Sequence, residues 1–369
     1  MFIRQTFRIY PNKKQELVLK QWTGQARFVW NNMLSLNQKT YEETKKFVFA
    51  YDMSNKLPEL KKEFEWLKEC PSQVLQQKCQ DLGTALSFKK NGRGFPKFKS
   101  KHRDTSGIRF PQGIKIEGNR IKLPKIKSGI KIKLHQEFHG KRGACTIYKN
   151  RAEQWFASFV VEIADVTPNT NATKVVGIDV GLKDFAITSD GEIVKNPKFL
   201  RKSEKKLKAA QRKLSRKTKG SNNRNNARLK VARIHNKIKN QRKDFINQLS
   251  SSIAKNYDLV VMENINVVGL MKNHCLAKSI ADASWSIFTD AIRWQCLKRG
   301  KQFHQVGMFF PSSKTCSSCG EKKTDLTLSD RMYKCDNCGF EIDRDVNAAL
   351  NLKNQGIKEY TVGTTEIDA

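Results

Sequence analysis

Three acidic residues stand at the edges of apolar segments in a strongly basic chain. They are Asp179 in Val-Val-Gly-Ile-Asp-Val-Gly, Glu263 in Leu-Val-Val-Met-Glu-Asn, and Asp345 in Asp-Arg-Asp-Val-Asn-Ala-Ala. Partly buried carboxylates that lie together repel one another unless a cation joins them. Hard oxygen ligands favour Mg²⁺ or Mn²⁺, and a pair of such ions can promote phosphodiester hydrolysis. We therefore predict that this acidic trio forms a catalytic divalent-metal site.

The elements around the acidic trio could bring its carboxylates together. Asp179 and Glu263 each end a predicted strand, at the carboxyl edge where open α/β sheets place their ligands. In the last predicted helix, Asp345 shares a face with Ala348, Ala349 and Leu352. The two small alanines would let that helix approach the sheet closely.

Asp343 is the competing candidate for the third carboxylate. Its position directly before the last helix suits an N-terminal cap, and it could also be a secondary metal or positioning group. We prefer Asp345 because it shares the inward face with the alanines. For any one acid of the trio alone, a structural hydrogen bond would be the simpler interpretation.

Four of the nine cysteines are paired in two short motifs. In Cys316-Ser-Ser-Cys319-Gly and Cys335-Asp-Asn-Cys338-Gly, the glycine allows the turn that points both thiolates at one ion. We predict structural Zn²⁺, because four thiolates leave no open coordination position. Iron in a rubredoxin-like site and a redox dithiol are the alternatives. The predicted zinc ribbon directly precedes Asp345, so it could brace the last helix.

The composition favours nucleic acid as a partner. Lys and Arg number 70 against 35 Asp and Glu, which gives a formal net charge of +35. Such an excess suits nucleic acid or an anionic membrane, but no apolar stretch approaches the ~20 residues that span a bilayer. The N-terminus lacks a signal-peptide pattern. The other five cysteines are scattered singly, so we expect a reducing, cytoplasmic location.

Two segments have a composition that suits contact with nucleic acid. Residues 89–101 form a basic Gly/Pro loop with two phenylalanines, which suits phosphate contact and base stacking. A solvated turn with two core phenylalanines is an equal alternative. A long helical pair spans about 199–256, and between Lys198 and Lys243 its only acid is Glu204. We interpret that pair as a phosphate-tracking arm rather than a merely solvated face.

The predicted elements divide the chain into two multi-element parts. The first part has a strand at 2–10, helices near 13–46, 53–66 and 71–88, and short strands within 107–165, which predict a small antiparallel barrel or sheet. Residues 164–171 are a linker by composition. The second part has strands near 175–180, 186–189, 192–195, 258–263 and 303–308, with helices at 199–256, 280–299 and 343–353. This β-β-β-α-β-α-β-α order is that of a ribonuclease H type mixed sheet.

Motifs over essentially the whole chain resemble TnpB, the insertion-sequence-encoded RNA-guided nuclease family related to type V CRISPR effectors. The motifs of the second part, including both cysteine pairs, are highly specific. The resemblance rests on these segments: Phe7-Arg-Ile-Tyr-Pro11, Arg27-Phe-Val-Trp-Asn31, Gly94-Phe-Pro-Lys-Phe-Lys99, Gly177-Ile-Asp-Val-Gly181, Asn240-Gln-Arg-Lys-Asp-Phe245, Glu263-Asn-Ile265, Pro311-Ser-Ser-Lys314 and Asp343-Arg-Asp-Val-Asn-Ala-Ala349. Asn264 and Asn247 depart from the residues that many relatives carry, Asp and His, without removing a predicted metal ligand.

The resemblance implies a multidomain α+β architecture. It would comprise a wedge-like β-barrel (1–10 and 105–168), a helical recognition insert (11–104), a RuvC-like nuclease domain (172–311 and 342–369) and an inserted zinc ribbon (312–341). It also implies that Asp179, Glu263 and Asp345 are the catalytic acids of the RuvC-type site.

The resemblance further implies a function and partners. Such a bacterial or archaeal protein would bind a noncoding RNA from the transposon end, recognise a short motif beside the target, and cut both DNA strands at one site. We expect one protein molecule with its RNA, associated with the nucleoid when bound. The alternatives are a repressor or RNA-binding protein without cleavage, and an RNA-independent junction or single-strand nuclease. A transposase is disfavoured, because no tyrosine or serine recombinase pattern is present.

Overall fold

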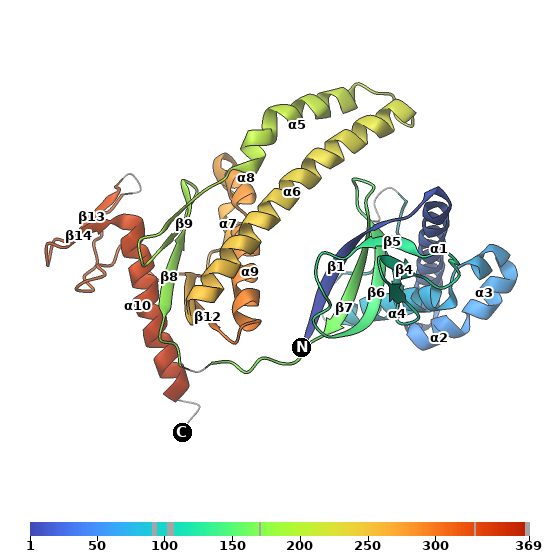
Figure 1. Ribbon diagram of the computed structural model, residues 1–369, viewed down its shortest axis with the longest axis horizontal. Coiled ribbons are helices and arrows are strands. Elements are labelled where there is room, and N and C mark those ends of the chain that lie inside the picture. The colour runs from blue at the N-terminus through green and yellow to red at the C-terminus, as the bar shows by residue number, and fades with distance from the viewer. Residues whose placement is uncertain (91–93, 102–106, 170, 328–329, 366–369) are drawn as a thin grey trace. The chain divides into compact units, whose positions relative to one another are not determined.

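A computed structural model describes residues 1–90, 94–101, 107–169, 171–327 and 330–365. The chain divides into two compact units, Met1–Asp165 and Val166–Ala369. Both contain a sheet and helices (Figure 1). Part of the predicted basic loop, residues 91–93, lies outside the described residues.

The first unit is built on a seven-stranded antiparallel sheet in the order β2-β6-β7-β1-β5-β4-β3. As predicted, the first strand joins the sheet, between β7 and β5. In the described part of the chain no pairing joins β2 to β3, and closure into a barrel stays a prediction. β2 and β6 were not among the predicted runs. The strands are β1 (Phe2–Tyr10), β2 (Ile108–Phe110), β3 (Lys115–Glu117), β4 (Arg120–Lys122), β5 (Ile130–Lys133), β6 (Lys141–Lys149) and β7 (Trp155–Glu162).

Helices cover the core of this unit. α1 (Lys13–Thr44) begins with a capping box, in which the Asn12 side chain accepts from the Gln15 N–H at 2.9 Å and the Gln15 side chain accepts from the Asn12 N–H at 3.0 Å. The helical region predicted near 53–66 is confirmed, and it is divided into short helices. The segment forms α2 (Ala50–Asn55), α3 (Leu57–Glu63) and the 3-10 helix η1 (Glu65–Glu69), because Pro58 suits only the first turn of a helix. α4 (Ser72–Lys90) follows as predicted.

The second unit contains a mixed five-stranded sheet in the order β10-β9-β8-β11-β12. β8, β9 and β10 are antiparallel neighbours, whereas β11 is parallel to both β8 and β12. The predicted order of strands and helices is confirmed. The strands are β8 (Val175–Val180), β9 (Asp184–Thr188), β10 (Ile193–Lys195), β11 (Leu259–Glu263) and β12 (Gln302–Val306).

Helices lie on both faces of this sheet (Figure 1). On one face of the sheet, Leu352 of α10 packs with Val261 of β11. On the other face, α6 and α9 cover the sheet, and Phe288 of α9 lies in the same core as Met262 of β11. The helix predicted for 280–299 is wrong as one piece, because Ser284 has a left-handed φ of 59° and separates α8 from α9. The helices are α5 (Phe199–Ser215), α6 (Asn222–Asn256), α7 (Val267–Leu270), α8 (His274–Ala283), α9 (Trp285–Leu297) and α10 (Arg344–Thr365).

The closeness of α10 to β8 depends on a glycine. A Cβ added at Gly177 would lie 2.0 Å from the carbonyl oxygen of Ala349 and 2.6 Å from the nitrogen of Lys353. Ala348 and Ala349 are buried, as the predicted inward face requires. The close approach that the alanines predicted is therefore present, and the strand contributes to it by having no side chain at Gly177.

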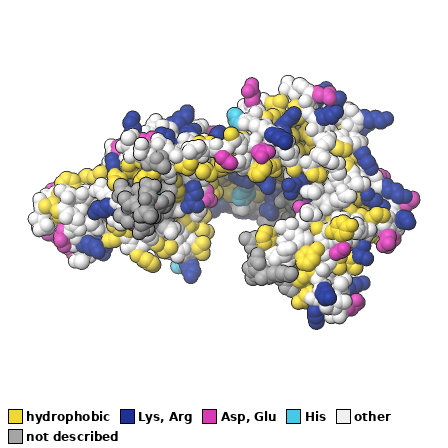
Figure 2. Space-filling model, turned by 90° about the horizontal axis from the view of Figure 1, so that it is seen from below, with side chains coloured by type: hydrophobic (Ala, Val, Ile, Leu, Met, Phe, Trp, Pro, Cys, Tyr) yellow, Lys and Arg dark blue, Asp and Glu magenta, His cyan; other side chains and the backbone are white. Residues whose placement is uncertain are grey.

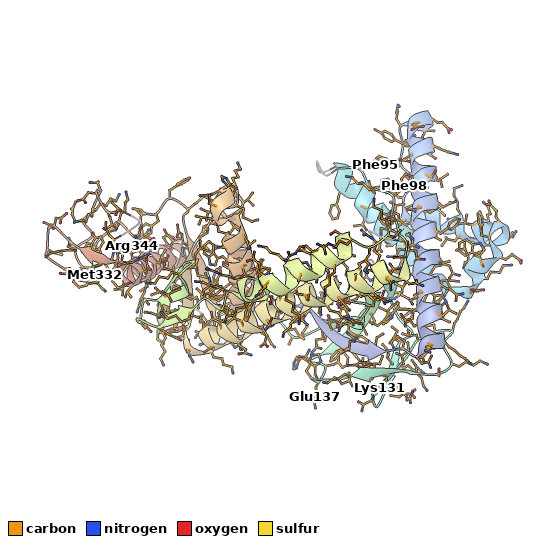
Figure 3. The ribbon with its side chains drawn as sticks, turned by 90° about the horizontal axis from the view of Figure 1, so that it is seen from above. Phe95, Phe98, Lys131, Glu137, Met332 and Arg344 are labelled. Carbon is orange, nitrogen blue, oxygen red and sulfur yellow. The ribbon has the colours of Figure 1, made fainter. Side chains whose placement is uncertain are left out.

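A two-stranded hairpin precedes α10. β13 (Met332–Lys334) pairs antiparallel with β14 (Glu341–Asp343), with Met332 opposite Asp343. Arg344 begins α10 at the end of this hairpin, and Figure 3 shows Met332 and Arg344 near each other there. Among the described residues, every helix is too short or too polar to cross a membrane.

Candidate metal-dependent active site

The second unit brings the charges of the acidic trio within reach of one another. Asp179 lies near the end of β8 and is half-buried. Burial, followed by the charges of Asp345 and Glu263, raises its pKa to about 7. Segments more than 80 residues apart in the sequence thus come close enough at one edge of the sheet for the charges of Glu263 and Asp345 to act on Asp179.

Glu263 and Asp345 approach this edge from different elements. Glu263 is the last residue of β11, where burial raises the pKa of its carboxyl. Asp345 lies in the first turn of α10. Nη2 of Arg344 is 3.4 Å from Oδ1 of Asp345, and the Arg344 charge also opposes the rise in the pKa of Asp179. Arg344 is therefore a further member of the site, which the sequence reasoning missed although it stands between Asp343 and Asp345.

The three carboxylates are less tightly clustered than the cysteines. Of the His, Cys, Asp and Glu side chains in the described ranges, only the four paired cysteines form a set of three or more whose ligand atoms all lie within 4.8 Å of one another. The carboxylates of the trio are therefore spread more widely.

Asp343 has a different role from that of Asp345. It is exposed, and its Oδ1 accepts from the N–H groups of Asp345 at 2.9 Å and Val346 at 3.2 Å. These bonds satisfy two of the free N–H groups at the start of α10, as an N-terminal cap does. The capping interpretation of Asp343 is thus confirmed.

The four paired cysteines converge as predicted. Sγ of Cys316 lies 3.7 Å from Sγ of Cys338, and Sγ of Cys319 lies 3.6 Å from Sγ of Cys335. A tetrahedral zinc site with bonds of ~2.3 Å has sulfur–sulfur edges of about 3.8 Å, whereas a disulfide is ~2.05 Å long. The sulfur positions therefore fit a zinc ion and exclude disulfides between these pairs.

The pKa values of two of these thiols, Cys319 and Cys338, are shifted in opposite directions. The N–H of Glu321 is the main cause that lowers the pKa of Cys319 to about 6. The N–H of Phe340 lowers the pKa of Cys338, but its sulfur neighbours outweigh that effect and raise the value to about 12. A divalent cation would remove the need for any of the four thiols to keep its proton.

Two buried asparagines tie the start of the zinc-binding segment to α10. The Asn347 side chain donates to the carbonyl oxygen of Thr315 at 2.7 Å and accepts from the N–H of Ser317 at 3.0 Å. The Asn351 side chain donates to the carbonyls of Ser312 at 2.8 Å and Thr315 at 2.6 Å. The cysteine site is thus connected directly to the helix that carries Asp345.

Sequence comparison decides the family. A protein of Streptomyces pristinaespiralis that carries the name "Putative RNA-guided DNA endonuclease" is 34% identical over 364 residues, which cover 97% of this chain and 90% of the relative. A protein of Escherichia coli K12 that carries the name "Putative RNA-guided DNA endonuclease InsQ" is 30% identical over 375 residues, which cover 95% of this chain and 91% of the relative. The chain belongs to the TnpB family.

Family models match three segments of this TnpB-family chain. A model described as "Probable transposase" matches residues 158–274, a "Cas12f1-like, TNB domain" model matches 285–352, and a "Helix-turn-helix domain" model matches 1–46. In the structure, residues 1–46 hold β1 and the single long helix α1 rather than two helices and a turn.

Solved structures of type V effectors give weaker matches. The Cas12f1 complex with single-guide RNA and target DNA is 18% identical, covers 96% of this chain and 99% of its own, and has a TM-score of 0.38. CasPhi-2 (Cas12j) bound to crRNA is 9% identical, covers 97% of this chain and 98% of its own, and has a TM-score of 0.45.

The basic loop of this TnpB-family chain packs on α1 within the first unit. Asn31 donates to the carbonyl of Lys99 at 2.9 Å and accepts from its N–H at 2.8 Å, and the Lys99 ammonium lies 3.6 Å from the Trp30 ring centroid. Phe95 packs against the core, whereas Phe98 is 53% exposed (Figure 3). Phe95 therefore fits the core alternative, whereas base stacking by Phe98 stays a prediction.

The predicted basic arm is a pair of helices in the second unit, α5 and α6 (Figure 1). Glu204, the acid near its start, forms ion pairs with Lys208 at 2.8 Å and Lys278 at 2.5 Å. Most lysines and arginines of the pair are exposed. On the face of the molecule seen in Figure 2, basic side chains are scattered rather than gathered in one patch.

Proposed function

We propose that this chain is an RNA-guided DNA endonuclease of an insertion sequence. It would hydrolyse phosphodiesters of both target strands at one RuvC-type site after recognising a short motif beside the target. The observation that carries the proposal is that Glu263 and Asp345 both act on the partly buried carboxyl of Asp179, in a chain with a net charge of +35. A carboxylate cluster in a basic protein is suited to hold cations against a polyanion.

The side chains of the site would divide the work. Asp179, Glu263 and Asp345 would hold divalent ions, Mg²⁺ or Mn²⁺, and the carboxyl edge of the sheet would fix their separation. Arg344 would orient the Asp345 carboxylate through its 3.4 Å contact. When bound, the ions would supply Lewis-acid activation of water and stabilise the leaving 3′ oxygen.

The remaining parts would bind nucleic acid and brace the site. Residues 1–10 and 105–168 would form the wedge-like barrel, 11–104 the recognition insert, 172–311 and 342–369 the RuvC-like domain, and 312–341 the zinc ribbon, with Zn²⁺ on the four cysteines. The partners would be a noncoding RNA from the transposon end and double-stranded DNA, in the cytoplasm or nucleoid. The names of the two bacterial relatives support this assignment.

The test uses the protein purified with its own RNA. Sequencing of the copurified RNA should find a discrete transposon-end transcript, and a plasmid with a matching site should be cut in Mg²⁺ and left intact in EDTA. Asp179→Ala should bind the same plasmid without cutting it. Cutting that survives this substitution would overturn the role of Asp179, and cutting that survives removal of the RNA would overturn guidance.

A repressor or RNA-binding protein is the second candidate. It would bind RNA and DNA with the same salt dependence and would not cut under any metal condition. The carboxylate convergence disfavours it, because binding alone gives no reason to bury repelling acids together.

A further inference from the structure

A polar groove begins directly after Glu263, on the second unit. It is a hollow of about 180 Å³ that opens at the carboxyl ends of β11 and β12. Asn264, the next residue after Glu263, lies on its rim, and its N–H donates to the carbonyl of Val306 at 3.1 Å. The groove therefore lies next to Glu263 of the acidic trio, because a residue that lines it directly follows Glu263 in the chain.

One face of α9 supplies most of the polar lining. Ser286, Thr289 and Arg293 stand at i, i+3 and i+7, so they share a face of the helix. Phe288 and Ile292 are fully buried on the opposite side, against the sheet. The amphipathic pattern of α9 thus points hydroxyl and guanidinium donors toward the groove.

Arg293 is held in place without a carboxylate. Its Nη2 donates to Oε1 of Gln305 on β12 at 2.5 Å, and its guanidinium carbon lies 5.2 Å from the ring centroid of Phe303. Asp290 also lines the groove, yet within the described residues Arg293 has no ion pair with it or with any other acid. A guanidinium fixed by an amide and a ring keeps its charge available for an anion.

The register of the sheet relates this groove to the carboxylates. Gln305 is opposite Met262, and Val306 is opposite Glu263. Because side chains alternate along a strand, Gln305 lies on the α9 face and Glu263 on the α10 face. A strand of nucleic acid that crosses the end of the sheet would meet the carboxylates on one side and the groove on the other.

We propose that this groove binds the sugar-phosphate backbone of the DNA strand being cut, next to the scissile phosphate. Arg293 contacts one phosphate, and Ser286 and Thr289 donate to that phosphate or its neighbour. The proposal rests on the proposed function and adds the substrate contacts of the same site. The donors suit phosphate oxygens, and a contact to phosphate positions the strand without reading the DNA sequence directly.

The test combines protein and DNA substitutions in single-turnover cleavage by the RNA-loaded protein. Neutral methylphosphonates replace, one at a time, the phosphates flanking the cut. Arg293→Ala should lower the cleavage rate about 10-fold, as loss of a hydrogen-bonded charge contact does. At one position the methylphosphonate should slow the wild type by a similar factor and should slow Arg293→Ala no further. Thr289→Val should give a smaller loss.

Lys298→Ala is the matched control, because it removes one exposed positive charge from the end of the same helix outside the groove. Its methylphosphonate profile should equal that of the wild type. Thermal unfolding of each variant checks that the fold is intact, and Arg293→Lys keeps the charge if Arg293→Ala is unstable. Identical profiles for Arg293→Ala and Lys298→Ala would overturn the groove. Absence of any cutting by the wild type would instead overturn the proposed function.

Discussion

At the scale of single residues, Asp343 and Asp345 show how two neighbouring acids acquire different roles. Asp343 is exposed and accepts two backbone N–H groups at the start of α10. Asp345 is half-buried beside Arg344 and acts on the carboxyl of Asp179. Sequence alone favoured Asp345 on its helical face and left Asp343 open. The cap geometry explains Asp343 without a metal.

These contacts predict separate effects of substitution. Asp345→Asn should lower the cleavage rate by at least about 100-fold, because loss of even an outer partner of a metal ligand costs ~10–100-fold. Asp343→Asn should retain cutting, because Asn caps a helix as well as Asp does. Asp343→Ala should lower the free energy of unfolding by about 1 kcal/mol. Single-turnover cleavage and urea unfolding measure the two effects, and equal loss of cutting in both Asn variants would contradict the assignment.

At the scale of elements, the acidic trio depends on how α10 lies against β8 and β11. Gly177 faces the backbone of α10 at Ala349, and Gly356 of α10 faces Val261, where an added Cβ would lie 2.4 Å from Cγ2 of the valine. A glycine on the strand and another on the helix thus permit the same close contact. Asp345 reaches the end of the sheet because its helix lies this near.

A side chain at Gly177 should therefore disturb the site from a distance. Gly177→Ala should lower the free energy of unfolding by about 1–3 kcal/mol, as overpacking of a core does, and should slow cutting because α10 carries Asp345. Gly307→Ala is the control, since its Cβ would meet no atom within 4 Å. Urea unfolding and cleavage of a matched plasmid would check both variants. Wild-type behaviour of Gly177→Ala would refute the close contact.

The asparagine connection predicts that the zinc-binding segment and α10 are coupled. Asn347→Ala would leave the N–H of Ser317 without this partner, at a cost of about 1–3 kcal/mol for a group left unsatisfied, whereas the carbonyl of Thr315 would keep its bond from Asn351. Zinc should then be lost faster to a chelator, which a colorimetric zinc assay follows. In the wild type, removal of zinc should reduce cutting at low Mg²⁺ more than at high Mg²⁺. Unchanged zinc release in Asn347→Ala would argue against the coupling.

At the scale of the whole molecule, the net charge of +35 should make nucleic-acid binding strongly salt-dependent. Individual residues of the basic loop should act differently on that dependence. Lys97 and Phe98 are neighbours and both exposed, yet one offers a charge and the other a ring.

The affinity for a single-stranded RNA oligonucleotide, measured over a series of salt concentrations, separates the two contributions. Lys97→Ala should reduce the slope of log K against log salt by about 0.7, because one fewer counterion is released. Phe98→Ala should weaken binding by about 1 kcal/mol without changing the slope, as loss of stacking does. Tyr51→Ala, which removes another exposed ring of the same unit, should change neither. A changed slope in Phe98→Ala would contradict a stacking role.

Much of the fold follows from local patterns. Apolar runs predicted β7, β8 and β11, and the paired cysteines predicted their own cluster, because spacing of two or three residues fixes which side chains share a face or a turn. One error arose where a single backbone angle decides. Ser284 divides a continuous apolar pattern into α8 and α9, and a side-chain pattern carries no sign of its left-handed φ.

The sequence by itself determined the acidic trio as candidates, the four cysteines and the basic character, because residue type and local spacing set charge, ligand class and strand or helix face. Only the tertiary structure decided that Asp343 caps α10, that Arg344 accompanies Asp345, and that Gly177 admits the helix. It also revealed the groove beside Glu263. These features depend on contacts between segments far apart in the chain, and such contacts are set by packing, which no local pattern encodes.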